Sequence, residues 1–297
     1  MKQINFIKLI PLYFSISGAV LAIGIFSLIV LKVRPAIDFT GGSLVEVELQ
    51  ASEGNTVNEG TVRSALADKK IEVNSIQPAG ENRWLIRSKM AEGIDKNVQS
   101  ALAEKFSKAE VTRFESIGPA LGKELLTKTF FGITLSSLGI LLYVAYRFGG
   151  GKYGVCAVLA MIHDSLVVFG AFSLLGHFKG AEVDALFVTA LLTVLSFSVH
   201  DTIVVYDRIR ENLRKFPQEK FEPLANRSVN ETMKRSINNS LTIIIMLVIL
   251  TWLGGTTVRY FSLALLIGTI TGTYSSPFVA VPLLVVWNKW AGRKKKS

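Results

Sequence analysis

The sequence is poor in cysteine and in charged residues. Cys156 is the one cysteine among 297 residues, so the chain forms no internal disulfide and has no cysteine-based metal site of its own. Charged residues make up only 19% of the chain, hydrophobic residues make up 49%, and the mean hydropathy is +0.40. This composition excludes an ordinary soluble domain and indicates a polytopic membrane protein.

Acidic residues are scarce outside one segment. Residues 36–128 have a net charge of −2, whereas the rest of the chain has a net charge of +12. The positive excess flanks the apolar runs, as expected of residues that anchor spans against anionic lipid. A nucleic-acid-binding face would group its basic residues on a folded surface, so we expect no nucleic-acid partner.

Six apolar runs meet or approach the roughly 20 residues that a membrane span needs. They cover residues 9–33, 129–146, 153–175, 185–206, 241–254 and 258–287. The fifth borrows residues from Ile237 onward, and Pro277 and Pro282 favour a tilt or kink in the sixth. Basic residues concentrate in the second-to-third and fourth-to-fifth connections and in the tail, which places these segments and both termini in the cytoplasm.

Residues 36–123 form the longest stretch outside the apolar runs, and they alternate between two periodicities. Segments 43–50, 71–77, 83–87 and 110–116 are strand-like, and segments 57–67 and 94–106 have helical spacing. The order β-α-β-β-α-β is that of a ferredoxin-like fold. The predicted fold class is therefore a polytopic α-helical membrane protein with six transmembrane helices and an α+β ferredoxin-like extracytoplasmic domain between spans 1 and 2.

This prediction divides the chain into four parts. Residues 1–35 are the cytoplasmic N-terminus and the first span, which we interpret as an uncleaved signal anchor. Residues 36–123 are the extracytoplasmic βαββαβ domain. Residues 124–290 are a five-helix membrane bundle with a cytoplasmic loop at 207–236, and residues 291–297 are a basic cytoplasmic tail.

Two near-copies of one heptapeptide, at 163–169 and 200–206, each place a His-Asp pair inside an apolar run. A carboxylate in a lipid-spanning helix is unfavourable by about 2.5 to 3.5 kcal/mol, so it is rarely kept without a proton, ion or partner. At 1.5 Å per residue, Asp164 lies roughly 16 Å and Asp201 roughly 9 Å from the cytoplasmic side. Both acids therefore belong to the inner half of the bundle, where His163 and His200 accompany them.

Three interpretations of these pairs stay open. Each Asp is protonated and hydrogen-bonded for packing, or the two pairs bind a metal, or the acids handle a proton or another cation. Neighbouring residues on a helix point about 100° apart, which disfavours a shared metal ion, and we expect none. Proton handling is favoured because a desolvated Asp exchanges its proton as its hydration changes.

Arg235 lies just before the fifth apolar run and has two interpretations. It is a cytoplasmic anchor, or, if the helix begins before Ser240, it reaches the bundle as a fixed counter-charge for Asp201.

Two Gly-containing motifs bracket the outer domain. Asp38, Gly41 and Gly42 follow the first span, and Gly118 and Pro119 precede the second, where they fit turns or hinges. No nucleophile and base are arranged for catalysis, so we expect no enzyme.

Several strings together resemble the SecD/SecF family of protein-export membrane proteins, which are related to RND transporters. They are Asp-Phe-Thr-Gly-Gly at 38–42, Glu-Ser-Ile-Gly-Pro at 115–119, His-Asp at 163–164, the run 201–212 and the run 235–240. The resemblance covers nearly the whole chain. It implies a SecF-like accessory subunit of the Sec translocase in the plasma (inner) membrane that acts with SecD beside the SecYEG channel.

In that family, the proton gradient helps to draw a translocating polypeptide outward, and no cofactor is required. The acid matching Asp201 and the arginine matching Arg235 belong to the proton path, and we expect Asp164, His163 and His200 to accompany them. His200 stands where the family usually has Asn, which leaves Na⁺ as an alternative coupled ion. Two other functions stay open: half of an RND-type small-molecule exporter, and a non-transporting assembly scaffold of the translocase.

Overall fold

The computed structural model describes residues 4–52, 56–80 and 82–294, and it divides into two compact units. A helical unit contains the residues up to Val33, Phe131–Ala181 and the residues from Leu186 onward. An outer unit contains Arg34–Phe130 and Glu182–Ala185. The predicted domain at 36–123 lies within the outer unit, which also includes the start of the second span and a four-residue segment before the fourth.

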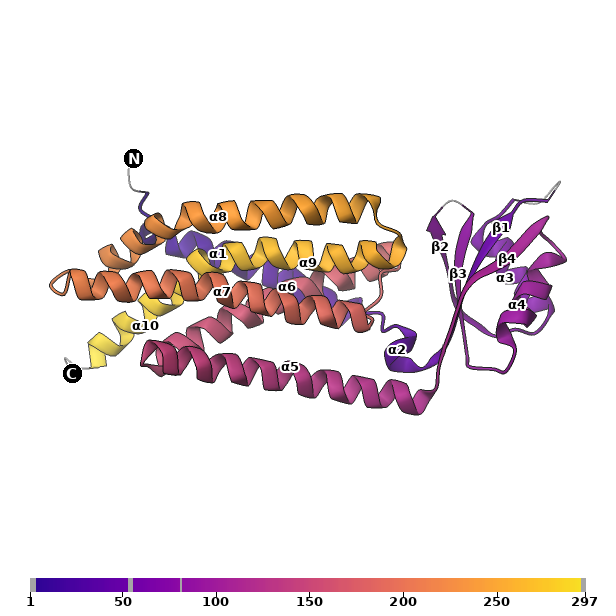
Figure 1. Ribbon diagram of the computed structural model, residues 1–297, viewed down its shortest axis with the longest axis horizontal. Coiled ribbons are helices and arrows are strands. Elements are labelled where there is room, and N and C mark those ends of the chain that lie inside the picture. Colours follow the sequence, from indigo (N-terminus) through magenta and orange to yellow (C-terminus); the bar gives the residue numbers. More distant parts are fainter. Residues whose placement is uncertain (1–3, 53–55, 81, 295–297) are drawn as a thin grey trace. The chain divides into compact units, whose positions relative to one another are not determined.

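The helical unit contains long apolar helices and one short 3-10 turn at Ile7–Leu9. Its helices (Figure 1) are α1 (Ile10–Val30), α5 (Pro119–Phe148, shared with the outer unit), α6 (Gly151–Lys179), α7 (Ala185–Lys215), α8 (Phe221–Leu253), α9 (Thr256–Ser275) and α10 (Val281–Lys294). Six candidate membrane spans lie in the described residues, which confirms the predicted number. Helices suit a bilayer because every interior backbone group is hydrogen-bonded within its own segment.

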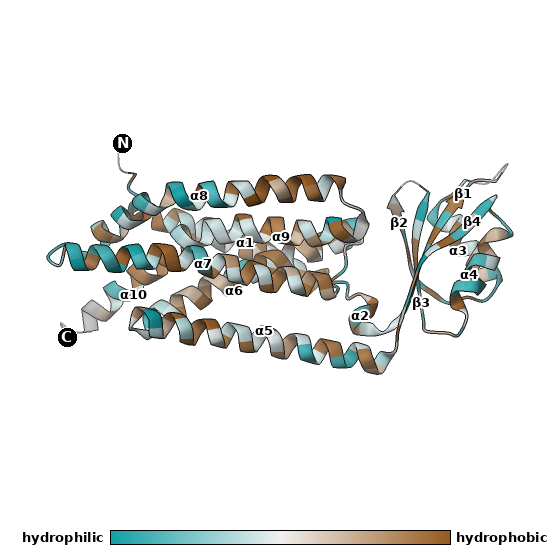
Figure 2. Cartoon of the chain, in the orientation of Figure 1, coloured by the Kyte–Doolittle hydropathy of each residue, from teal (hydrophilic) through white to brown (hydrophobic). Residues whose placement is uncertain are grey.

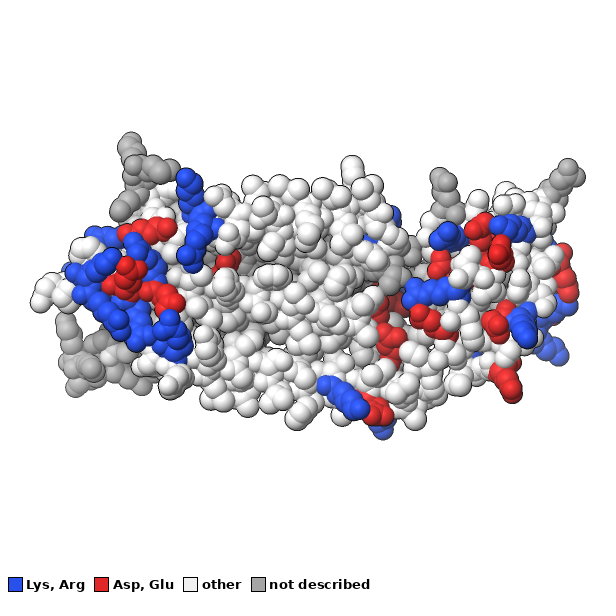
Figure 3. Space-filling view, in the orientation of Figure 1, with Lys and Arg blue, Asp and Glu red and all other residues white. Residues whose placement is uncertain are grey.

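Apolar and charged residues separate along this unit. Figure 2 shows hydrophobic residues along the helices and hydrophilic residues at the end where α7 passes into α8. At that same end Figure 3 shows Lys and Arg gathered with Asp and Glu, whereas the visible middle of the bundle is uncharged. Sequence and structure therefore agree that the apolar middle of the bundle faces lipid.

The segment 207–236, expected to be a loop, is mostly helical. Helix α7 continues to Lys215 and α8 begins at Phe221, so only residues 216–220 connect them. Glu211 pairs with Arg208 and Lys215 at three- and four-residue spacing, and such pairs support a helix beyond its apolar run.

The sixth span is interrupted, as its prolines indicated. A π-helical segment, Ser276–Ala280, includes Pro277 and separates α9 from α10. The predicted basic tail begins within α10, and residues 295–297 lie outside the described residues.

Residues 4–7 are held by the first turns of α8. The Phe6 amide donates a hydrogen bond to Asn226 Oδ1 at 2.7 Å, and the Ile4 amide donates to Asn230 Oδ1 at 3.1 Å. The Asn226 side-chain amide donates to the Ile4 carbonyl at 3.1 Å.

The outer unit contains a four-stranded sheet covered by two helices. Its elements are α2 (Ile37–Thr40), β1 (Gly42–Gln50), α3 (Glu59–Asp68), β2 (Val73–Gly80), β3 (Arg83–Ser88), α4 (Ile94–Ala103) and β4 (Lys108–Ile117). The strand order is β2-β3-β1-β4 and all neighbours are antiparallel, which confirms the predicted βαββαβ domain. Val45, Val47 and Leu49 alternate along β1 and are fully buried in its core.

Candidate functional site

Asp201 of α7 faces α8. Its Oδ2 accepts a hydrogen bond from Ser236 Oγ at 2.8 Å, which is its one hydrogen bond within the described part of the chain. No ion pair to Asp201 occurs among those residues, and its side chain is only partly buried. An ionised carboxylate has about four acceptor positions, so Asp201 keeps capacity for water or another donor.

Asp164 of α6 has a different environment, because it is fully buried and has three partners. Its Oδ2 accepts hydrogen bonds from Ser198 Oγ of α7 at 2.6 Å and Ser275 Oγ of α9 at 2.7 Å. Its Oδ1 lies 2.9 Å from His163 Nδ1. Asp164 therefore joins three helices in the centre of the bundle.

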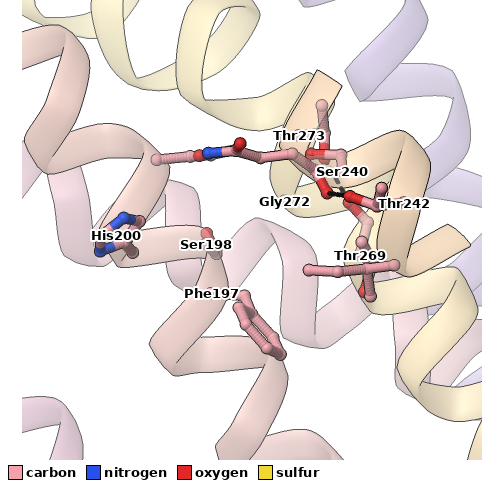
Figure 4. A pocket seen from close by; sticks show the side chains of 11 residues that line it. Phe197, Ser198, His200, Ser240, Thr242, Thr269, Gly272 and Thr273 are labelled. Atoms are coloured by element: carbon pink, nitrogen blue, oxygen red, sulfur yellow. Dashed lines mark hydrogen bonds between the residues drawn. The ribbon is translucent and has the colours of Figure 1, made fainter. Parts of the chain in front are cut away.

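A cavity of about 290 Å³ lies among α7, α8 and α9 and is lined by hydroxyl-bearing and apolar residues (Figure 4). Asp201 lines it directly, and Asp164 is linked to it through Ser198, which lies three residues before Asp201 on α7. Thr273 Oγ1 of α9 donates a hydrogen bond to Ser240 Oγ of α8 at 2.6 Å at this cavity (Figure 4). The other lining residues are Phe197, His200, Asn239, Thr242, Ile243, Thr269 and Gly272. These hydroxyl and amide groups suit water molecules that would deliver a proton.

Arg235 lines a second cavity, of about 490 Å³, which Asp201 does not line. The other lining residues are Val204, Asp207, Arg208, Glu211, Glu231 and Thr232. Helix α8 begins at Phe221, well before Ser240, so Arg235 belongs to that helix and immediately precedes the Ser236 that contacts Asp201. The expected ion pair between Arg235 and Asp201 is absent from this conformation within the described residues.

The histidines of the two His-Asp pairs, His163 and His200, have different surroundings. His200 is exposed and lines the first cavity, as Asp201 does. His163 is buried against Asp164, and its Nε2 has no hydrogen-bond partner among the described residues. No group of three or more His, Cys, Asp or Glu residues suited to a metal occurs in the part of the chain that the structure describes.

The two Gly motifs meet within the outer unit. Gly41 has a φ of +72°, and a Cβ there would lie 2.8 Å from the Pro119 Cα. Gly42 has a φ of +127°, with Ser88 O at 2.9 Å from an added Cβ, whereas an added Cβ at Gly118 would meet nothing within 4 Å. Asp38 Oδ2 accepts a hydrogen bond from the Ala185 amide at 2.7 Å. The motifs therefore form one close-packed junction.

The sequence interpretation missed a buried ion pair in the outer unit. Arg87 Nη2 of β3 lies 2.6 Å from Glu182 Oε2. Burial raises the pKa of Glu182 to about 7, with a contribution from Asp184, although the charge of Arg87 opposes this change. Burial also lowers the pKa of Arg87.

The sequence interpretation also missed two of the serines that hold the acids, Ser236 and Ser275. A signal for Ser236 was present, because hydroxyl residues recur at every fourth position at 228, 232, 236 and 240.

Comparison with known proteins gives consistent results over nearly the whole chain. Residues 97–290 match the family model described as protein export membrane protein SecD/SecF, C-terminal, and residues 26–53 match the SecD/SecF GG motif. The chain is 40% identical to the protein translocase subunit SecF of Thermobaculum terrenum, over 93% of this chain and 91% of that one. It is also 40% identical to the subunit SecF of Anaerolinea thermophila, with the same coverage.

Among solved structures, the chain is similar to SecDF, a translocon-associated membrane protein from Thermus thermophilus. The TM-score is 0.86 at 32% identity. The match covers 97% of this chain but only 39% of that longer one.

Proposed function

The chain belongs to the SecD/SecF family of protein-export membrane proteins, and from this premise we propose that Asp201 couples a transmembrane proton gradient to polypeptide export. The protein is a SecF-like accessory subunit of the Sec translocase and a multi-pass membrane protein. We further propose that the coupled ion is the proton, that Asp201 and Arg235 handle it, and that the protein has the partners named below.

The contrast between the two acids carries the proposal. Asp201 has one hydrogen-bond donor and lines the cavity among α7, α8 and α9, so a proton can reach it and leave it. Asp164 is fully buried with three partners, so it holds the helices around that cavity together. An acid that exchanges a proton needs a hydrated approach, and the cavity that Asp201 lines has room for water.

Arg235 supplies the charge that makes the two protonation states of Asp201 different. An ionised Asp201 attracts the guanidinium, whereas a neutral Asp201 leaves Arg235 to the acids of the second cavity, Asp207, Glu211 and Glu231. Arginine keeps its charge in both states. Proton loading of Asp201 thereby shifts α7 relative to α8.

The further partners follow from the family. The chain spans about two fifths of the solved SecDF chain, and its likeness to that protein supports SecD as a partner. We place this pair beside SecYEG in the inner membrane, with both termini cytoplasmic, anionic lipid at the basic end and the translocating polypeptide at the outer unit. No enzymatic step is part of this function.

The experiment is translocation into vesicles that contain the complete complex, with and without a proton gradient. Asp201→Asn keeps the shape of the side chain and removes its charge, and we expect the gradient to give no stimulation. Asp95→Asn, the same change in α4 of the outer unit, is the matched control and should keep full stimulation. Normal stimulation in Asp201→Asn would refute the proposal, and a lower yield of the complex without a change in gradient dependence would indicate a scaffold.

A further inference from the structure

We infer that Ser236 is a positioning residue for Asp201, whose hydroxyl holds the acid in one state and bonds to its own helix in the other. This inference rests on the proposed function of Asp201. It assigns a role to a residue outside the His-Asp pairs and the arginine.

The first observation is a stripe of four hydroxyl residues on α8. Ser228, Thr232, Ser236 and Ser240 are spaced four apart, so they share one face of the helix, and all four are buried. A buried hydroxyl in a span must find an acceptor, and the nearest one is the carbonyl four residues earlier.

Three members of the stripe use that acceptor. Ser228 donates to the Leu224 carbonyl at 2.9 Å, Thr232 to the Ser228 carbonyl at 3.0 Å, and Ser240 to the Ser236 carbonyl at 3.0 Å. Ser236 is the exception, because its hydroxyl leaves the helix and donates to Asp201 at 2.8 Å. The Thr232 carbonyl is the equivalent acceptor for Ser236.

The second observation is where this bond lies. On α7, Asp201 lines the first cavity and Val204, one turn later, lines the second. On α8, Ser240 lines the first cavity and Thr232 lines the second. Ser236 lies midway between them and lines neither, so its bond to Asp201 separates the two cavities.

A change of one side-chain torsion exchanges the two acceptors of Ser236. While Asp201 is ionised, its carboxylate is the stronger acceptor and keeps the hydroxyl. When Asp201 is protonated, the hydroxyl returns to the Thr232 carbonyl. Neither state leaves a buried donor without a partner, which keeps the two states close in free energy.

The surroundings of Asp201 define what else acts on its protonation. His200 of α7 lines the same cavity as Asp201, Arg235 of α8 lines the second cavity, and α9 presents Thr269 and Thr273 to the first. A variant that keeps all of these groups and removes only the Ser236 hydroxyl therefore isolates its contribution.

The test is the pH dependence of carbodiimide labelling at Asp201, measured by peptide mass spectrometry on the reconstituted complex. Carbodiimides modify the protonated acid, and loss of the donor favours that form, so labelling of Ser236→Ala should persist to a pH higher by about one unit. Ser236→Thr keeps the hydroxyl and should stay within about 0.3 unit of wild type. Ser228→Ala, the same change two turns away on the same stripe, is the matched control, because Ser228 is buried and lines neither cavity, and it should also stay within that range.

A wild-type labelling curve for Ser236→Ala would overturn the inference, as would an equal shift for Ser228→Ala. Failure of the proposed function is distinguishable, because it would appear as normal gradient stimulation in Asp201→Asn. A shifted Ser236→Ala curve would then still show that Ser236 positions the acid.

Discussion

His163 Nδ1 lies 2.9 Å from Oδ1 of Asp164, its neighbour in the chain, although adjacent side chains on a helix point about 100° apart. The second oxygen of Asp164 is left for Ser198 and Ser275 of two other helices. One carboxylate thus organises its own helix and two others in the centre of the bundle. An acid with contacts to His163, Ser198 and Ser275 is suited to stabilising the helix bundle rather than to exchanging a proton.

Asp164→Ala should destabilise the bundle strongly. The change removes the acceptor of the buried Ser198 hydroxyl and the carboxylate contacts of His163 and Ser275, and we expect the free energy of unfolding in detergent to fall by about 3 kcal/mol or more. Ser165→Ala is the control, because Ser165 donates only to the Met161 carbonyl of its own helix. Equal stabilities of the two variants would contradict the structural role of Asp164.

Arg235→Gln should reduce gradient-stimulated translocation at least tenfold, whereas Arg235→Lys should retain a measurable part. Lysine keeps the positive charge but lacks the planar guanidinium. The control is Arg214→Gln, in the exposed last turn of α7, which should have no effect in the same vesicle assay. Full activity of Arg235→Gln would show that the charge is not used.

The stability of the outer unit should fall as the pH rises from about 4.5 to 8. Because burial raises the pKa of Glu182 to about 7, the folded unit holds a proton that the unfolded chain releases near its ordinary pKa of 4.5. The stabilisation is complete below pH 4.5 and is lost as the pH passes through about 7. Glu182→Gln should remove this decline.

Denaturant unfolding followed by Trp84 fluorescence measures this pH dependence, in a chain whose other three tryptophans are replaced by Phe. Glu72→Gln is the control, since Glu72 forms an exposed ion pair with Lys89. Loss of the Glu72–Lys89 ion pair should leave the pH dependence of stability unchanged, because exposed ion pairs contribute little to the free energy of unfolding. If the stability of the Glu182→Gln variant still fell as the pH rose, another titrating group would be responsible for the pH dependence.

Gly41→Ala should destabilise the outer unit by about 2 kcal/mol or more. The added Cβ would require a left-handed backbone at φ +72° and would approach the Pro119 Cα to 2.8 Å. Gly118→Ala adds the same atom to the partner motif in open space and should change the free energy of unfolding by less than about 0.5 kcal/mol. The Trp84 measurement compares them, and equal effects would exclude a close-packed junction.

Much of the fold was predictable because its signals are local. The six spans follow from runs of apolar residues, and β1 follows from the alternation of Val45, Val47 and Leu49. The start of α8 at Phe221 was not predictable from hydropathy, because its first turns are polar and are held by contacts with residues 4–7. The helix there depends on a partner distant in sequence.

The candidate site was predictable only in part. Asp164 and Asp201 stand out because an acid in an apolar run is unfavourable, and that rule finds them without a structure. Ser198 and Ser275 give no such signal, since serine is tolerated throughout membrane helices and its partner depends on packing. Arg235 was left between two interpretations, because its place on α8 depends on the polar first turns of that helix and its separate cavity depends on which way α7 and α8 face.

The Asn226 contact to residues 4–7 also sets an order of assembly during synthesis. Phe6 and Asn226 are 220 residues apart, and a ribosome adding 5–20 residues per second needs roughly 11–44 s to make the second after the first. For that interval the amide of Phe6 has no access to its native acceptor. Residues 4–7 therefore form their native hydrogen bonds only after α8 has been synthesised. Because this contact joins residues so distant in sequence, we expect it to form late in the folding of the helical unit.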